Sequence, residues 1–391
     1  MMRSTSTLPQ PVTEPSALIN AARLRSKLAA DGIDVLLVTA PENSYYLSGV
    51  FIRTQVSIRD RLALVIWPID EAPTFVVCNI EESLARAEGS VADVRTYVEH
   101  AESPMSRVVQ VLNERGFDRL RIGIERSYLP ARAFDELHRG VPQADLVGAD
   151  ALIESVRAVK TEAETSRIAD AFRRTEAAIR EAWGRSAAGD TEKTVADRML
   201  FSMLDHGASG LRHMTLASGE NTVHAHMTPA DRRLQAGDTV LTDTGAHFYG
   251  FSSDMARMGV VGAPTRQRSD EYARYREVYV ELLHFIRPGI TAADVFAHCT
   301  AAFHKAGLPM TSPHVGHSLT RMAGHENPIL HPGCDLPLEA GMLLAVEPSF
   351  KPRADQRYHI EDLVQVTDTG SRILTDWAST DRMIEFAAGP S

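Results

Sequence analysis

The sequence predicts an α+β protein that carries a smaller α/β domain at its N-terminal end. The length of 391 residues allows two domains, each with its own core. In the first half, segments with helical apolar spacing alternate with short apolar strands, which favours an α/β layer. The second half combines long helical segments with short strands in a different order, which indicates a domain of another kind.

The first half begins with a helix predicted over residues 16–31. Gly32 ends this helix, and an apolar strand follows at 33–38. Further predicted elements are strands at 62–67, 74–78 and 121–124, and a helix at 104–115. No phosphate-binding glycine loop follows any of these strands, so this half offers no nucleotide site.

A domain boundary is expected near residue 155, which separates an N-terminal domain over 15–155 from a second domain over 156–391. The second domain is predicted to contain helices at 160–188, 191–206, 269–286 and 291–306 and strands at 239–243, 248–251, 343–346 and 360–366. Residues 1–14 are rich in Ser, Thr and Pro and lack an apolar core, so we expect a disordered tail and no signal peptide.

Composition excludes several classes of partner. The chain has 41 Lys and Arg against 51 Asp and Glu, a net charge of −10, which argues against nucleic acid and anionic membranes. No apolar run approaches the roughly 18 residues that a membrane span needs. Three sparse cysteines, Cys78, Cys299 and Cys334, provide no disulfide framework and favour a cytoplasmic setting.

Carboxylates occur where apolar strands should end. Asp243 ends the strand at 239–243, and Asp254 follows the next strand along the chain. Two carboxylates on adjacent strand ends of a hairpin can converge, and like charges repel each other unless a cation lies between them. A turn carboxylate plus a helix or strand cap is the alternative interpretation of this pair.

Three further segments repeat the pattern. His317 lies in a glycine-containing segment, Glu347 closes an apolar strand, and Glu361 lies beside Asp362 inside another apolar strand. A buried charge is costly unless it is paired or bound to metal. Carboxylates that bridge two ions, with one imidazole, predict a dinuclear site for Mn, Co, Zn or Fe, since Ca and Mg prefer shells made only of oxygen.

Taken in order over roughly residues 160–370, these motifs resemble the pita-bread metallohydrolases, the family of Xaa-Pro aminopeptidases, prolidases, methionine aminopeptidases, creatinase and ectoine hydrolase. The N-terminal half resembles the smaller α/β domain of the creatinase–prolidase branch, with residues 43–49 as its signature. The resemblance implies a pita-bread catalytic domain over 156–391.

The same resemblance assigns roles to the candidate residues. Asp243 would chelate one metal, and Asp254 would bridge both. His317 and Glu347 would hold the other metal, and Glu361 would also bridge. A hydroxide between the metals would be the nucleophile, and Glu347 would carry a proton to the leaving nitrogen.

Two more histidines match positions that contact substrate in the family. His226 lies upstream of the first metal-binding Asp, and His325 follows the metal-binding His317. An imidazole at either position can donate to the oxyanion of a tetrahedral intermediate. A surface loop is the alternative interpretation of both.

The substrate side departs from the family pattern. Prolidases usually carry Arg two residues before the last Glu, where this chain has His359. Arginine grips a carboxylate bidentately, and a neutral imidazole cannot. Arg321 is the candidate replacement, so His359 and Arg321 are the predicted substrate-binding residues.

These observations predict hydrolysis of a C–N bond in a small molecule or short peptide, by a chain that the resemblance implies is a homodimer. An Xaa-Pro peptidase and a non-peptide amidohydrolase of the ectoine hydrolase or creatinase type both fit. Further alternatives are a metal-free creatinase-like enzyme, a carbon–sulfur lyase and a non-catalytic binding module. A cysteine hydrolase using Cys299 and His298 is disfavoured, because adjacent helix residues point apart.

Overall fold

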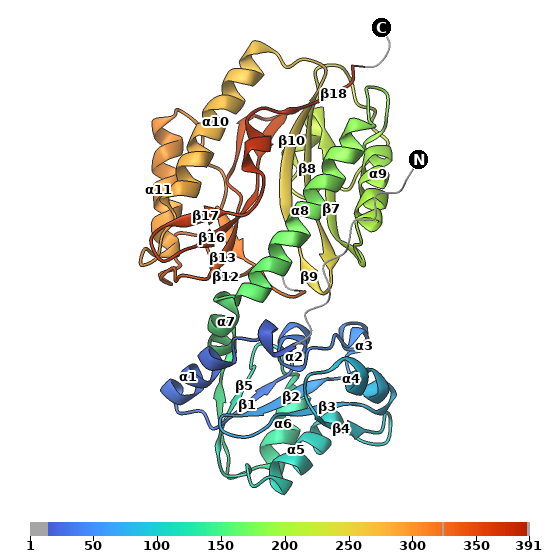
Figure 1. Cartoon of the computed structure of the whole chain (residues 1–391), viewed down its shortest axis with the longest axis vertical. Helices are drawn as coiled ribbons and strands as arrows, with labels where there is room; N and C mark the ends of the chain where they lie inside the picture. The colour runs from blue at the N-terminus through green and yellow to red at the C-terminus, as the bar shows by residue number, and fades with distance from the viewer. Residues whose placement is uncertain (1–14, 323, 389–391) are drawn as a thin grey trace. The chain divides into compact units, whose positions relative to one another are not determined.

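The computed structural model describes residues 15–322 and 324–388 (Figure 1). The tail predicted for residues 1–14 lies outside the described residues. The described chain divides into two compact units. The first extends to Val156 and includes Thr161–Glu164, and the second comprises Arg157–Lys160 and the residues from Thr165 onward.

A mixed six-stranded sheet forms the centre of the first unit, with the strand order β4-β3-β2-β1-β5-β6. The central strand β1 pairs antiparallel with β2 and parallel with β5. The strands are β1 (Val35–Val38), β2 (Leu64–Pro68), β3 (Thr74–Cys78), β4 (Asp93–Tyr97), β5 (Arg121–Ile124) and β6 (Asp145–Gly148).

Helices cover both faces of this sheet, as the side chains of β1 illustrate. Leu36 belongs to the apolar cluster that contains Leu24 of α1, whereas Leu37 belongs to the cluster that contains Val108 of α5. Successive strand residues point to opposite faces, so each face requires its own helices. The helices are α1 (Ala21–Asp31), α2 (Pro41–Ser48), α3 (Arg53–Ser57), α4 (Glu82–Glu88), α5 (Pro104–Glu114), α6 (Ala131–Gly140) and α7 (Asp150–Ala158).

Two five-stranded sheets form the centre of the second unit. One has the order β18-β10-β8-β7, with β9 paired to β8, and the other has the order β12-β11-β13-β16-β17. The first consists of β7 (Gly210–Ser218), β8 (Thr239–Phe248), β9 (Phe251–Ser252), β10 (Met255–Val261) and β18 (Ile384–Phe386). The second consists of β11 (Gly316–Ser318), β12 (Glu326–Ile329), β13 (Leu343–Val346), β16 (Asp362–Val366) and β17 (Ser371–Ile373). A separate ribbon pairs β14 (Ser349–Arg353) with β15 (Gln356–His359).

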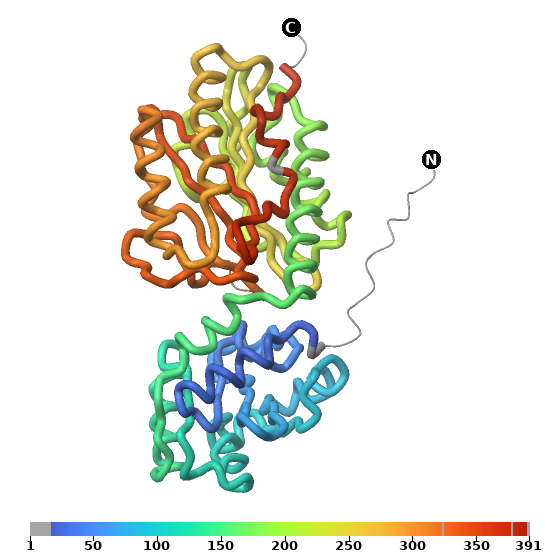
Figure 2. Tube along the Cα trace, turned by 60° about the vertical axis from the view of Figure 1, so that its left-hand side comes forward, coloured from blue at the N-terminus to red at the C-terminus, as the bar shows by residue number. Residues whose placement is uncertain are grey.

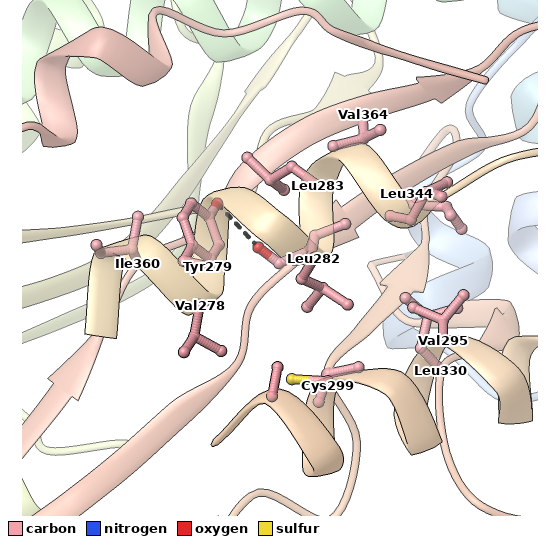
Figure 3. Packing of buried hydrophobic residues seen from close by; sticks show 14 of the residues in the cluster. Val278, Tyr279, Leu282, Leu283, Val295, Cys299, Leu330, Leu344, Ile360 and Val364 are labelled. Atoms are coloured by element: carbon pink, nitrogen blue, oxygen red, sulfur yellow. Dashed lines mark hydrogen bonds between the residues drawn. The ribbon is translucent and has the colours of Figure 1, made fainter. Parts of the chain in front are cut away.

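Helices flank these strands on two sides. Figures 1 and 2 show α8 (Glu162–Gly184) and α9 (Glu192–Asp205) on one side and α10 (Arg266–Phe285) and α11 (Ala292–Lys305) on the other. Tyr279 and Leu282 of α10, Cys299 of α11 and Leu344 of β13 share one buried apolar cluster (Figure 3). This core fixes the second sheet against its helices and leaves the strand ends to carry polar side chains.

The α+β arrangement agrees with the class predicted from the sequence. Among residues 15–322 and 324–388, no helix combines the length and the apolar character that a membrane crossing requires.

Candidate metal centre

Asp243 lies within β8, opposite Thr215 of β7 and Ala256 of β10. The prediction that it ends a strand is therefore wrong, since β8 continues to Phe248. Two imidazoles face this carboxylate from outside the strand. Nε2 of His213 lies 2.8 Å from Oδ1 of Asp243, and Nε2 of His359 lies 3.6 Å from Oδ2.

Asp254 lies between β9 and β10 and is 3% exposed. The residue before it is fixed on both sides: the hydroxyl of Ser253 lies 2.7 Å from that of Thr175 on α8 and accepts a hydrogen bond from the backbone N–H of Ala246. This anchoring orients the Asp254 carboxylate toward Asp243. The two carboxylates and His213 each place an atom within 4.8 Å of the others.

His317 of β11 and Glu347, directly after β13, come from neighbouring strands of the second sheet. Nδ1 of His317 donates to the Ser318 carbonyl at 2.9 Å, which leaves Nε2 free to act as a ligand atom. That Nε2 lies 3.3 Å from Oε1 of Glu347 and 3.7 Å from Oδ2 of Asp254. The imidazole thus joins residues of both sheets.

Glu361 lies between β15 and β16, and its backbone is hydrogen-bonded to β10 of the β18-β10-β8-β7 sheet. Its N–H donates to the Ala256 carbonyl at 3.2 Å, and the buried guanidinium of Arg257 donates to its carbonyl at 2.7 Å. The same guanidinium pairs with the next residue, Asp362, at 2.8 Å. Asp362 therefore pairs with Arg257 and does not face the cluster. The Glu361 side chain does face it, with Oε1 3.9 Å from Nε2 of His317.

The unsatisfied atoms of this cluster match what a cation requires. Nε2 of His317, Oε1 of Glu347 and Oε1 of Glu361 are all buried, and no described residue completes a hydrogen bond with any of them. Buried polar atoms without partners are costly, and a divalent ion is a partner common to all three. Carboxylates with one imidazole suit Mn, Co, Zn or Fe, so the residues fit the predicted metals.

The pKa values in the cluster split in opposite directions. Burial raises the pKa of Asp254, and burial together with the neighbouring acids raises that of Glu361 far above its usual range. Burial also opposes the charge of Glu347, but the adjacent His317 outweighs it and lowers the pKa. Asp243 behaves likewise: the imidazoles of His213 and His359 outweigh burial and hold its pKa well below normal. Without a cation, Asp254 and Glu361 hold their protons to higher pH than an ordinary carboxyl group does.

Arg212 and His213 of β7 are site residues that the sequence analysis missed. Arg212 is the extra residue of a β-bulge, so two consecutive side chains reach the same carboxylate. Nη1 of Arg212 lies 2.5 Å from Oδ2 of Asp254, and Nε2 of His213 lies 3.2 Å from its Oδ1. The available signal was an arginine followed by a histidine inside the nine-residue strand β7.

A cavity of about 900 Å³ opens on the cluster. His226 and His325, the predicted substrate-contacting residues, both line it. The His325 ring stacks on His317 with centroids 3.7 Å apart, and burial next to His317 lowers its pKa to about 4, so it is neutral at neutral pH. His314 also lines the cavity, with Nδ1 3.5 Å from Glu347 Oε1, and was not predicted.

The two predicted substrate-binding residues lie elsewhere. Neither His359 nor Arg321 is among the described residues that line the cavity. His359 is fully buried behind it, with Nε2 3.5 Å from Oε2 of Glu347. The guanidinium of Arg321 lies over the Phe251 ring at 5.1 Å. Arg357 and Lys351, which the sequence analysis did not select, occupy the cavity wall instead.

The cysteine alternative is wrong. Cys299 is fully buried among apolar side chains (Figure 3), and burial raises the pKa of its thiol far above the normal value. A thiolate nucleophile requires a lowered pKa and access to substrate. The ring of His298 stacks on Phe285 with centroids 3.7 Å apart.

Comparison with known families decides the relationship. A model described as metallopeptidase family M24 matches residues 166–368, and one described as the creatinase/prolidase N-terminal domain matches residues 21–159. The chain belongs to metallopeptidase family M24. It is 26% identical over 364 residues to an Xaa-Pro dipeptidase of Lactobacillus delbrueckii subsp. lactis. This alignment covers 91% of this chain and 96% of the relative.

Solved structures of dipeptidases share the fold. An Xaa-Pro dipeptidase from Bacillus anthracis superposes with a TM-score of 0.82 at 23% identity, covering 94% of this chain and 99% of that one. A dipeptidase from Mycobacterium ulcerans gives 0.78 at 26% identity, with coverages of 94% and 96%. The pita-bread class and the family resemblance are thereby confirmed, and the chain is a metal-dependent hydrolase.

Proposed function

We propose that the protein is a dinuclear metal-dependent hydrolase that cleaves a C–N bond, with Xaa-Pro peptides as the first substrate class to consider. The observation that carries this proposal is the meeting of orphaned ligand atoms from His317, Glu347 and Glu361 in one buried cluster. Asp243 and Asp254 complete a set of four carboxylates and one imidazole, which is enough for two divalent ions.

In this proposal Asp243, Asp254 and Glu361 would hold one ion, while Asp254, Glu361, His317 and Glu347 would hold the other. Bound divalent ions lower the pKa of water toward neutrality and supply a hydroxide nucleophile for attack on a carbonyl. The split pKa values support the assignment, because carboxylates that retain protons when no cation is present become good ligands once cations replace those protons.

The remaining groups have separate roles. Glu347 lines the cavity and would move a proton to the leaving nitrogen. His325 and His226 line the same cavity and would donate to the developing oxyanion, which a neutral imidazole can do through its N–H. Buried His359 would hold Asp243 and Glu347 in place and would not contact substrate.

A non-peptide amidohydrolase is the second candidate. The position that usually supplies a carboxylate-binding Arg holds His359, and this imidazole is buried among the acids. This position therefore cannot supply the usual bidentate grip on a C-terminal carboxylate, which makes a small cyclic or N-acyl amide a candidate substrate.

A substrate screen tests the function. Protein loaded with Mn²⁺ or Co²⁺ is offered Xaa-Pro dipeptides, longer Xaa-Pro peptides and ectoine-type cyclic amidines. We expect C–N cleavage in at least one class and a loss of at least about a hundredfold in Asp254→Ala, since replacing a residue that only supports a metal ligand already costs about ten- to a hundredfold. Exposed Asp231, outside the cluster, provides the control Asp231→Ala. Inactivity toward every class contradicts the proposal, as does full activity in Asp254→Ala.

Three further expectations, about the domain boundary, the cellular location and the oligomeric state, belong to the same proposal. The boundary near residue 155 would separate an N-terminal domain over 15–155 from the catalytic domain over 156–391. A cytoplasmic setting is supported by three buried cysteines that form no disulfide with one another. A homodimer is expected from the family resemblance, and its mass can be measured by light scattering.

A further inference from the structure

Two buried cations, Arg157 and Lys160, lie where α7 leads into α8. The chain between them is attached to the start of β13: Val159 pairs with Met342, and the N–H of Lys160 donates to the Gly341 carbonyl at 3.0 Å. All of these residues belong to the second unit. The attachment holds both cationic side chains against the sheet that contains β11 and β13.

The side chain of Lys160 reaches the residue that follows the predicted metal ligand. Its Nζ donates to the Ser318 hydroxyl at 2.6 Å and to the Ala158 carbonyl at 3.2 Å. Ser318 is fully buried, and its carbonyl accepts the hydrogen bond from Nδ1 of His317 at 2.9 Å. An acceptor of this kind fixes the tautomer and the orientation of a metal-binding imidazole. Lys160 is therefore linked to the His317 ring through a single residue.

The strand pairing is irregular at this residue. The register between β11 and β12 shifts between His317 and Ser318, whereas the pairing of β11 with β13 is regular. A shift of this kind disrupts the ladder locally and redirects side chains. The contact between Lys160 and the Ser318 hydroxyl adds a restraint at the point where the ladder with β12 is interrupted.

The second cation acts on the opposite strand. Arg157 forms a buried ion pair with Glu326 of β12, the residue that follows His325. The His325 ring in turn stacks on His317. Lys160 and Arg157 thus each hold a residue next to one histidine of the stacked pair, so this part of the chain sets the placement of both rings.

We propose that Lys160 is a positioning residue for the metal centre: it holds the Ser318 hydroxyl and thereby fixes the carbonyl that orients His317. The inference rests on the proposed function, in which His317 is a metal ligand. Neither Lys160 nor Ser318 is among the described residues that line the cavity, so both act through His317 and not on the substrate. Loss of the contact leaves every ligand in the chain but lets the imidazole depart from its position.

A cobalt titration of two variants and their combination tests this route. Lys160→Met removes the ammonium and keeps an unbranched side chain, and Ser318→Ala removes only the hydroxyl. We expect each to weaken Co²⁺ affinity about tenfold and to change the visible Co²⁺ spectrum. The double variant should lose about tenfold and not about a hundredfold, because both changes remove the same interaction.

Matched controls come from α9. Lys193→Met replaces an exposed lysine, and Ser202→Ala removes a buried hydroxyl that donates to Glu181. Both should keep the wild-type affinity and spectrum. The spectrum at saturating Co²⁺ separates positioning from a general loss of stability, because a folded protein with its ligands in place gives the wild-type spectrum.

The possible failures can be distinguished. Wild-type affinity and spectrum in folded Ser318→Ala overturn the inference, also where Lys160→Met does not fold, and so do losses that multiply in the double variant. In both cases the wild-type protein still binds Co²⁺, and the proposed function stands. A wild-type protein that binds no Co²⁺ overturns the proposed function itself.

Discussion

Arg212 and His213 reach one carboxylate because the strand that carries them contains an extra residue. Regular alternation along β7 would send the two side chains to opposite faces, and the bulge turns both toward Asp254. Gly245, opposite His213, has room for no side chain: a Cβ there would lie 2.1 Å from the Ser253 carbonyl oxygen and 3.2 Å from Cε1 of His213. The bulge thereby places an imidazole beside two predicted metal ligands.

His213→Ala should weaken metal retention. Its Nε2 lies 2.8 Å from Asp243 and 3.2 Å from Asp254, so its loss removes either a ligand or the group that orients both carboxylates. We expect Co²⁺ affinity to fall about 10- to 100-fold and the visible Co²⁺ spectrum to change. His247→Ala, on β8 and outside the described metal-binding groups, is the control. An affinity and spectrum identical to wild type contradict this role.

Metal binding should release protons and weaken as pH falls. The pKa values of Asp254 and Glu361 are raised in the metal-free fold, so these groups hold protons above the usual carboxyl range and must lose them to bind an ion. By the same sign, their contribution to metal-free stability is present at low pH and is lost as pH rises through the raised values. Calorimetry of Mn²⁺ binding in buffers of different ionisation enthalpy measures the release. Binding without proton release, at equal affinity at pH 6 and 7.5, contradicts the prediction.

At the scale of elements, one buried arginine joins the two sheets behind the site. Arg257 of β10 donates to the Glu361 carbonyl and pairs with Asp362 at the start of β16. Tyr279 of α10 donates to the other oxygen of Asp362 at 2.8 Å. This network fixes the backbone that carries the Glu361 side chain. It therefore positions Glu361 without contacting the metal-binding atoms themselves.

Arg257→Met should cost about 3–5 kcal/mol of unfolding free energy, because it leaves Asp362 buried without its cation and Glu176 with only the more distant Arg180. Tyr279→Phe, which removes one hydrogen bond to the same carboxylate, should cost only about 1 kcal/mol. Urea unfolding of the metal-loaded proteins measures both. Equal losses in the two variants would show that the ion pairs add nothing beyond a single hydrogen bond.

Elements with a clear apolar pattern were predictable from the sequence. The strands at 74–78, 121–124 and 343–346 have the predicted bounds, because each is a short apolar run with a clear end. Strands with polar residues were not found: β7 carries Arg212 and His213, and the β14–β15 ribbon mixes Lys, Arg and Gln among its residues. Their pairing depends on tertiary contacts that override the local pattern.

At the scale of the whole molecule, the candidate site draws on two sheets. Its five predicted ligands come from β8 and the segment before β10 in one sheet, and from β11 and the ends of β13 and β16 in the other. The sequence identified these residues because each puts a polar group against an apolar strand. It did not identify Arg212, His213, His314 or Arg357, because their importance depends on how the strands are packed together. The ligand roles stay predictions.

Counting bound metal tests the central claim most directly. The purified protein is saturated with Mn²⁺ or Co²⁺, dialysed and analysed for metal content, alongside Glu361→Gln and the exposed-site control Asp231→Ala. If the buried acids are tolerated because cations neutralise them, wild type and control retain about two ions per chain and Glu361→Gln retains fewer. A wild-type protein that retains none, with its fold intact, contradicts this account.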